Sequence, residues 1–157
     1  MPENSLVIGD IAPDFTLPRD GGDEIRLSDQ RPSPVVLFFY PRDMTPGCTT
    51  EATEFSALAD AFAAAGVRVF GISKDSVASH DRFVAKKELR LPLLSDEAGD
   101  TCERYGVWQE KKMYGKTFMG IVRSTFLLDG NGRVARVWPK VKVAGHAQEV
   151  LDAARVL

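Results

Sequence analysis

The sequence predicts an α/β fold, in which a central mixed β-sheet has helices on both faces and an N-terminal β-hairpin precedes it. Continuous apolar runs typical of buried strands occur at 35–40 and 67–73, and a segment with helical spacing of apolar residues connects them. A turn signal at 129–132 separates two further strands. Strand–helix–strand connections give parallel strands and tight turns give antiparallel ones, so the sheet should contain both.

Length and composition favour one domain. The chain has 157 residues, of which 44% are hydrophobic, and it shows no linker, internal repeat or low-complexity segment. A chain of this size can bury a sizeable core, so we expect residues 1–157 to form a single domain. The formal net charge is -2 and the basic residues are dispersed, which argues against a nucleic-acid partner.

The sequence also gives no sign of export or of a membrane anchor. The segment MPENSLVIGD lacks the features of a secretory signal, and no uncharged apolar run is long enough to cross a bilayer. We therefore expect a cytoplasmic protein with no membrane partner.

The first predicted elements are a hairpin and a buried strand. Short alternating runs at Asp14–Leu17 and Glu24–Leu27 flank a Gly-rich turn, which is typical of a β-hairpin. Residues 28–34 form a polar, proline-containing loop. The run VVLFFY at 35–40 is β-branched and aromatic, as expected for a strand buried on both faces.

The middle of the chain alternates helices with strands. Apolar residues at helical spacing predict a helix over 46–65, which Gly66 can end, and a strand follows at 67–73. Capping residues at 75–79 precede a second helix over 77–89. A short strand at 93–95 and a small helix over about 99–105 complete this part.

The last third begins with a polar, lysine-rich segment at 109–117, which we expect to be an exposed loop. Strands at 123–128 and 134–138 flank the sequence DGNG, a strong hairpin signal. An amphipathic helix over 146–154 ends the chain. This order of elements is that of the thioredoxin-like architecture.

Cys48 is the strongest candidate for chemistry, because it falls in the first turn of the helix over 46–65. Thr45 is a favoured N-cap, and Pro46 is favoured at the first helical position. Unpaired amides and the helix dipole favour an anion there, which for a cysteine is the reactive thiolate. The alternative is a small buried hydrophobic residue, but the Thr-Pro-Gly turn after a strand favours chemistry.

The remaining titratable residues suggest neither a metal nor a cofactor. The two cysteines, Cys48 and Cys102, and the two histidines, His80 and His146, lack the spacing of metal ligands. Two cysteines are also too few for a disulfide scaffold. Both histidines look like ordinary polar helix positions, and Glu51 is expected only to stabilise the helix N-terminus.

The segment PRDMTPGCT at 41–49 resembles the active-site motif of peroxiredoxins. The resemblance extends over most of the chain, because GDIAPDFTL, LLSDEAGDTCERYGVW, GKTFMGIVRSTFLLD and VKVAGHAQEVL are similar to the bacterioferritin-comigratory or peroxiredoxin Q branch. It implies a thioredoxin-fold thiol peroxidase that reduces hydrogen peroxide and organic hydroperoxides.

The resemblance also implies a role for four residues. Cys48 would be the peroxidatic cysteine, Thr45 would hold thiolate and peroxide, Pro41 would shield the sulfur, and the Arg123 guanidinium would complete the site. The thiolate would attack a peroxide oxygen to give a sulfenic acid and water or an alcohol. Taken singly, Thr45 could be only an N-cap, Pro41 only a strand end, and Arg123 only a surface charge.

The sequence departs from this branch in its resolving cysteine. Many members carry one five residues after the peroxidatic cysteine, where this chain has Thr53, and others carry it in the next helix, where 77–89 contains none. Cys102 is the only other thiol, and we expect it to be structural or incidental, since a bridge needs Cα atoms within about 7 Å. The sulfenic acid of Cys48 should therefore react with an outside thiol: thioredoxin, glutaredoxin or a low-molecular-weight thiol.

Two other functions remain open. A thioredoxin-like disulfide reductase is disfavoured because Cys48 is not part of a C-x-x-C pair. A redox sensor or holdase without turnover should lack the Thr or the Arg of the site, and both are present. Phe39, Tyr40, Met44 and Phe118 could form an apolar wall for alkyl hydroperoxides, and the lack of a long exposed apolar segment favours a monomer.

Overall fold

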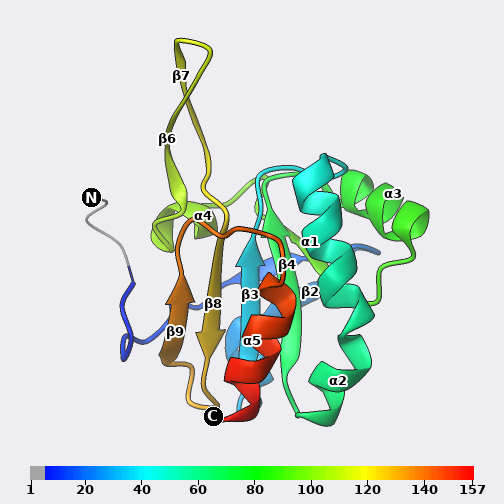
Figure 1. Cartoon of the computed structure of the whole chain (residues 1–157), viewed down its shortest axis with the longest axis vertical. Coiled ribbons are helices and arrows are strands. Elements are labelled where there is room, and N and C mark those ends of the chain that lie inside the picture. The colour runs from blue at the N-terminus through cyan, green and yellow to red at the C-terminus, as the bar shows by residue number, and fades with distance from the viewer. Residues whose placement is uncertain (1–5) are drawn as a thin grey trace.

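The structure is a computed structural model that describes residues 6–157, and at its centre lies a five-stranded β-sheet (Figure 1). In sheet order its strands are β5 (Leu93–Ser95), β4 (Arg68–Ser73), β3 (Val35–Phe39), β8 (Ser124–Leu128) and β9 (Val134–Trp138). The first three run parallel, whereas β8 and β9 pair antiparallel. The predicted mixed sheet and thioredoxin-like fold are therefore confirmed.

Alternation along β3 divides the core into two layers. Val35, Leu37 and Phe39 belong to the apolar cluster on one face of the sheet, while Val36 and Phe38 belong to the cluster on the other. All five residues of the strand are buried, as its continuous apolar sequence predicts.

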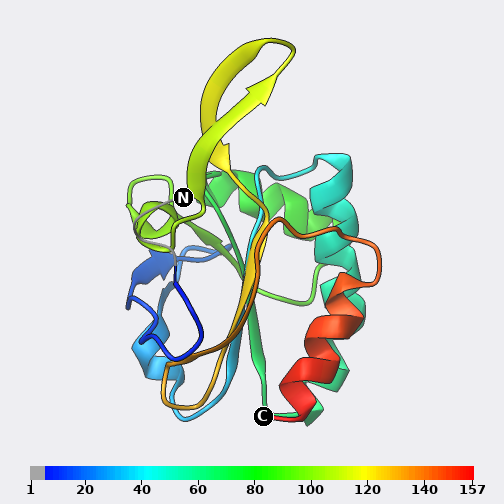
Figure 2. The same cartoon turned by 60° about the vertical axis from the view of Figure 1, so that its left-hand side comes forward.

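Different elements cover the two faces (Figure 2). The cluster that includes Phe38 is completed by four helices: α1 (Pro46–Ala57), α2 (Ala59–Ala64), α3 (Val77–Lys87) and α5 (His146–Arg155). The opposite face is covered by the N-terminal hairpin, a 3₁₀ helix and a short helix: β1 (Thr16–Pro18), β2 (Glu24–Arg26), η1 (Leu27–Gln30) and α4 (Thr101–Arg104).

The helix predicted over 46–65 is two helices in the structure. The break falls at Leu58, whose amide bonds to the carbonyl of Phe55 at 3.1 Å in a tighter 3₁₀-type turn. Apolar residues keep their helical spacing across this point, so periodicity alone could not show the break.

The prediction of a loop over 109–117 is wrong, because this segment is part of a β-hairpin. Strands β6 (Trp108–Met113) and β7 (Lys116–Ile121) pair antiparallel around a two-residue turn, Tyr114-Gly115, in which both φ angles are positive. Figures 1 and 2 show the hairpin projecting beyond the body of the molecule. Its side chains are mostly exposed, so the sequence carries no alternation between a buried and a solvent face.

Within residues 6–157, no helix is both long enough and apolar enough to span a bilayer. The expectation that the whole chain is one domain stays a prediction.

Candidate active site

The turn from β3 into α1 positions the candidate nucleophile. Thr45 occupies the N-cap of α1 with an extended backbone, and its carbonyl accepts the first helical hydrogen bond from Thr49 at 2.8 Å. Pro46 starts the helix, so Cys48 lies in the first turn, where backbone amides have no intrahelical acceptor. The Cys48 side chain faces inward, and the residue is only 1% exposed.

The hydroxyl of Thr45 does not cap the helix. It donates instead to the carbonyl of Arg42 at 2.9 Å, so the proton of the hydroxyl is engaged and its oxygen can still accept. Pro41 is half-buried at the start of the same turn.

Arg123 reaches Cys48 through the strand pairing. Because Ser124 is the partner of Phe39 across β8 and β3, the residue before Ser124 lies beside the point where the chain leaves β3 for α1. The Nη2 atom of Arg123 donates to the Sγ atom of Cys48 at 3.3 Å. A Cβ atom at Gly47 would lie 3.1 Å from Nη2, so glycine leaves room for the guanidinium over the first turn.

Glu51 is a site residue that sequence reasoning missed. Its Oε1 atom accepts from Nη1 of Arg123 at 2.6 Å, and the residue is 1% exposed. Its other oxygen has no hydrogen-bond partner among the described residues. The available signal was its position three residues after Cys48, which puts both side chains on one helix face.

Burial and charge act against each other in this group. Burial raises the pKa of Glu51 to about 7, although Arg123 acts in the opposite direction. Burial also lowers the pKa of Arg123, but the neighbouring Glu51 and Cys48 outweigh it, and the net shift is upward. The guanidinium is therefore a fixed positive charge beside the sulfur.

The charge of Lys111, in the middle of strand β6, is influenced by the site. Burial and the charge of Arg123 lower the pKa of Lys111 on β6, while Cys48 acts to raise it. The ammonium group is thus electrostatically coupled to the two residues that form the core of the site.

The apolar wall expected from sequence is wrong for Phe39, whereas Tyr40 belongs to the same apolar cluster as Cys48. Phe39 is fully buried in the cluster on the opposite face of the sheet from Cys48, because alternate strand residues point to opposite faces. Tyr40 is also fully buried and directs its hydroxyl to Asp43. Met44 and Phe118 are exposed.

Cys102 lies away from this group. It belongs to the apolar cluster on the opposite face of the sheet and is 0% exposed. Burial and then the charge of Asp96 raise the pKa of its thiol far above the usual range, which disfavours the reactive thiolate.

Both histidines are buried, in contrast to the polar helix positions expected from sequence. His146 accepts or donates at 2.8 Å with the hydroxyl of Thr125, and burial lowers its pKa to about 4, so the ring is neutral at pH 7. His80 contacts Asp43 in a buried network, which is also where a metal could be held, since donor atoms of Asp43, Asp75 and His80 lie within 4.8 Å of one another.

Comparisons with known proteins identify the family. Residues 8–137 match the model of the AhpC/TSA family. The chain is 45% identical over 148 residues to peroxiredoxin Bcp of Bacillus subtilis, covering 94% of both chains, and 43% identical over 149 residues to that of Escherichia coli, covering 95% of this chain and 96% of the other. A solved structure of the Xanthomonas campestris bacterioferritin comigratory protein, described for its alkyl peroxide reduction activity, superposes with a TM-score of 0.88 at 45% identity, covering 96% of each chain.

The chain therefore belongs to the AhpC/TSA family, in its Bcp and peroxiredoxin Q branch. It is a thiol-dependent peroxidase, whose substrate is a peroxide and whose turnover requires a reductant.

Proposed function

We propose that Cys48 is the peroxidatic nucleophile and that Arg123, Thr45 and Pro41 serve it. The observation that carries this proposal is the 3.3 Å contact between Nη2 of Arg123 and Sγ of Cys48. A guanidinium at that position stabilises a thiolate over a thiol, and it is the charged group best suited to a fixed geometry.

The chemistry follows from these positions. The Cys48 thiolate attacks one peroxide oxygen, an S–O bond forms while the O–O bond breaks, and the leaving oxygen takes a proton to become water or an alcohol. Arg123 stabilises the negative charge that develops on the leaving oxygen. Thr45, whose proton is engaged by Arg42, accepts a hydrogen bond from the peroxide O–H group and orients it. Pro41 shields the sulfur from water.

We further propose that an outside thiol resolves the Cys48 sulfenic acid. Cys102 lies on the opposite face of the sheet with its thiol held protonated, and Thr53 stands where many relatives have a cysteine. One thiol of the reductant attacks the sulfenic acid, releases water and forms a mixed disulfide. A second thiol then attacks this mixed disulfide and releases Cys48 in its reduced form. Thioredoxin, glutaredoxin or a low-molecular-weight thiol can supply both.

The proposed substrates are hydrogen peroxide and organic hydroperoxides. The Xanthomonas campestris relative is described for alkyl peroxide reduction, and Met44, four residues before Cys48 in the same turn, offers an exposed apolar contact here. The protein is proposed to act as a monomer in the cytoplasm, where two isolated thiols stay reduced.

A coupled assay tests the proposal. Reduced protein is mixed with hydrogen peroxide, thioredoxin, thioredoxin reductase and NADPH, and NADPH oxidation is followed beside the variants Cys48→Ser and Cys102→Ala. We expect turnover in the wild type and in Cys102→Ala, and none in Cys48→Ser. Turnover by Cys48→Ser would refute the proposal that Cys48 is the nucleophile. Stoichiometric oxidation of Cys48 without turnover by any of the three reductant classes would favour a redox sensor instead.

A further inference from the structure

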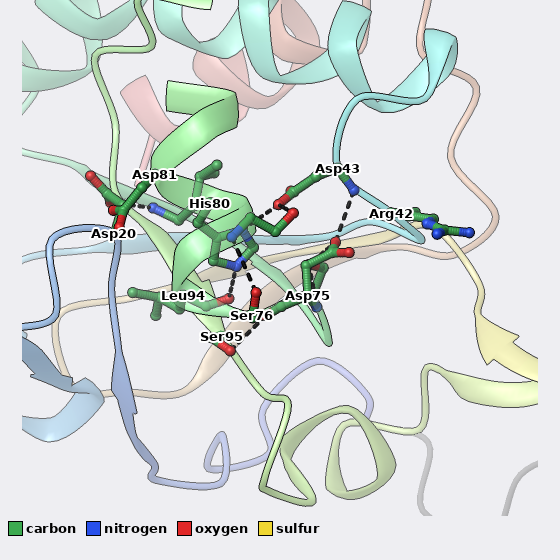
Figure 3. A network of polar contacts seen from close by, with 12 residues as sticks. Asp20, Arg42, Asp43, Asp75, Ser76, His80, Asp81, Leu94 and Ser95 are labelled. Carbon is green, nitrogen blue, oxygen red and sulfur yellow. Dashed lines mark hydrogen bonds and ion pairs between the residues drawn. The ribbon is translucent and has the colours of Figure 1, made fainter. Parts of the chain in front are cut away.

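A buried hydrogen-bond network lies next to the turn between β3 and α1 (Figure 3). The reaction proposed for Cys48 does not use this network. At its centre is Asp43, two residues before Thr45 and 7% exposed. Its carboxylate accepts from the hydroxyl of Tyr40 at 2.6 Å and from that of Ser79 at 2.8 Å. It also lies 2.7 Å from Nδ1 of His80, which belongs to α3.

The partners of His80 define its protonation. Its Nε2 atom lies 2.9 Å from the carbonyl of Leu94, which can only accept, so Nε2 carries a hydrogen. Its Nδ1 atom faces a carboxylate and donates to it, which makes the ring an imidazolium. Burial lowers the pKa of His80, but the hydrogen bond and charge of Asp43 outweigh it, and the net shift is upward. The pKa of Asp43 is lowered, because its hydrogen bonds and the charge of His80 outweigh burial.

A single peptide unit links this network to Thr45. The N–H group of Asp43 donates to Oδ2 of Asp75 at 2.8 Å, and the carbonyl on the other side of that peptide, from Arg42, accepts from the hydroxyl of Thr45 at 2.9 Å. Asp75 is itself fixed, because Oδ2 accepts from the hydroxyl of Ser73 at 2.6 Å. The orientation of the Thr45 hydroxyl therefore depends on a peptide held from α3 and the β4–α3 loop.

The turn needs such a restraint. Met44, between Asp43 and Thr45, has a φ of 64°, in the left-handed region that costs a non-glycine residue about 1 kcal/mol. An isolated turn of this sequence would relax toward ordinary backbone angles, and the hydroxyl of Thr45 would turn with it.

We infer that Asp43, His80 and Asp75 form a clamp that positions the hydroxyl of Thr45 for the peroxide. They are positioning residues, which act through the Arg42–Asp43 peptide and touch neither the peroxide nor the sulfur. The inference rests on the role proposed above for Thr45.

A comparison of two reactions of Cys48 tests the clamp. The rate constant for oxidation by hydrogen peroxide depends on the oriented hydroxyl, whereas alkylation by iodoacetamide depends only on the thiolate and its access. In His80→Gln we expect peroxide oxidation to slow by about tenfold or more and alkylation to stay within about twofold. The matched control is Asp81→Asn on the same helix, which removes a charge while its Oδ1 atom can still accept from the Gly21 amide, and it should leave both rates unchanged.

A double-mutant cycle with Thr45→Val separates the clamp from the proposed catalytic role. If the clamp acts through Thr45, His80→Gln slows peroxide oxidation in the wild-type background and has no further effect in Thr45→Val. A Thr45→Val protein with the wild-type rate would refute both the role of Thr45 and the clamp. An impaired Thr45→Val beside an unimpaired His80→Gln would refute the clamp alone, and so would equal slowing of oxidation and alkylation. If His80→Gln does not fold, Asp75→Ala at the half-buried end of the clamp is used in its place.

Binding of a metal ion is the alternative role for this network, because donor atoms of Asp43, Asp75 and His80 lie within 4.8 Å of one another. Peroxide oxidation that is lost with a chelator and restored by a divalent cation would also overturn the clamp and indicate a metal site.

Discussion

The proposed reactivity of Cys48 depends on the guanidinium of Arg123, which donates hydrogen bonds to two acceptors. Nη1 of Arg123 donates to Glu51 and Nη2 donates to Cys48, so the buried Glu51 side chain fixes the guanidinium that faces the sulfur. A lysine could form only one of these contacts at full strength, because an ammonium is a point charge on a flexible stem.

We therefore predict that Arg123→Lys keeps the fold but slows oxidation of Cys48 by peroxide. Loss of a charged hydrogen bond of about 1.5–3 kcal/mol corresponds to a decrease of about ten- to a hundredfold. Stopped-flow measurement of the rate constant at fixed pH checks this. Arg136→Lys, which alters an exposed pair with Glu149, is the matched control and should react at the wild-type rate. Full activity in Arg123→Lys would mean that the geometry of the guanidinium does not matter.

The raised pKa of the buried Glu51 predicts how the stability of the fold depends on pH. Its folded-state pKa of about 7 lies above the ordinary value of 4.5, so the fold prefers the protonated carboxyl. Its contribution to stability is greatest below about pH 4.5 and decreases as pH rises toward 7. Relative to Glu51→Gln, the wild type should lose about 1–3 kcal/mol of unfolding free energy between about pH 5 and pH 7.5. Urea denaturation at both pH values measures this, and parallel changes in the two proteins would contradict it.

At the scale of elements, the first turns of α1 decide how Cys48 can be resolved. Positions 48 and 53 lie on one helix, where five residues rise about 7.5 Å, beyond the roughly 7 Å that a disulfide tolerates between Cα atoms. A resolving cysteine at position 53 could work only if the start of α1 unwinds.

We predict that Thr53→Cys forms an intramolecular disulfide after one equivalent of peroxide and loses helical circular dichroism when it does. The variant Cys48→Ser/Thr53→Cys is the control, and it should do neither. If Thr53→Cys instead keeps a free thiol beside a Cys48 sulfenic acid, α1 is too rigid for this route, and a resolving cysteine at that position would not suffice.

Some elements were predictable from sequence and others were not, for physical reasons. The β3 strand and α5 follow from burial, because a buried strand is apolar throughout and a helix with one buried face shows periodic apolar residues. The β6–β7 hairpin buries neither face fully, so only backbone pairing defines it, and its sequence resembles a loop. Glu51 could have been found from its spacing to Cys48, whereas nothing in the sequence connects Asp43 with His80, 37 residues away.

For the whole molecule, the β-sheet separates the two thiols. Cys48 and Cys102 belong to apolar clusters on opposite faces, and β3 lies between those faces with all its residues buried. A bridge between them would require disruption of the core rather than movement of a loop. This arrangement is the physical basis for proposing an outside resolving thiol.

The projecting hairpin offers an exposed apolar surface through which two chains could associate. Sequence suggested no long exposed apolar segment, yet the hairpin exposes four large apolar residues: Met113, Tyr114, Phe118 and Met119. We still predict a monomer, and light scattering at micromolar concentration should give the mass of a single chain. A dimer would contradict this, and its loss in Phe118→Ser would locate the contact on the hairpin.

Mass spectrometry of intact protein under non-reducing conditions can decide whether peroxide oxidises Cys48 and whether an outside thiol then reacts with it. Reduced protein receives one equivalent of hydrogen peroxide without any added thiol, and then excess glutathione. We predict first the gain of one oxygen atom at Cys48, with Cys102 still a free thiol, and then a mixed disulfide between Cys48 and glutathione. Loss of two hydrogen atoms from the chain, with Cys48 and Cys102 joined in one peptide pair, would contradict this prediction.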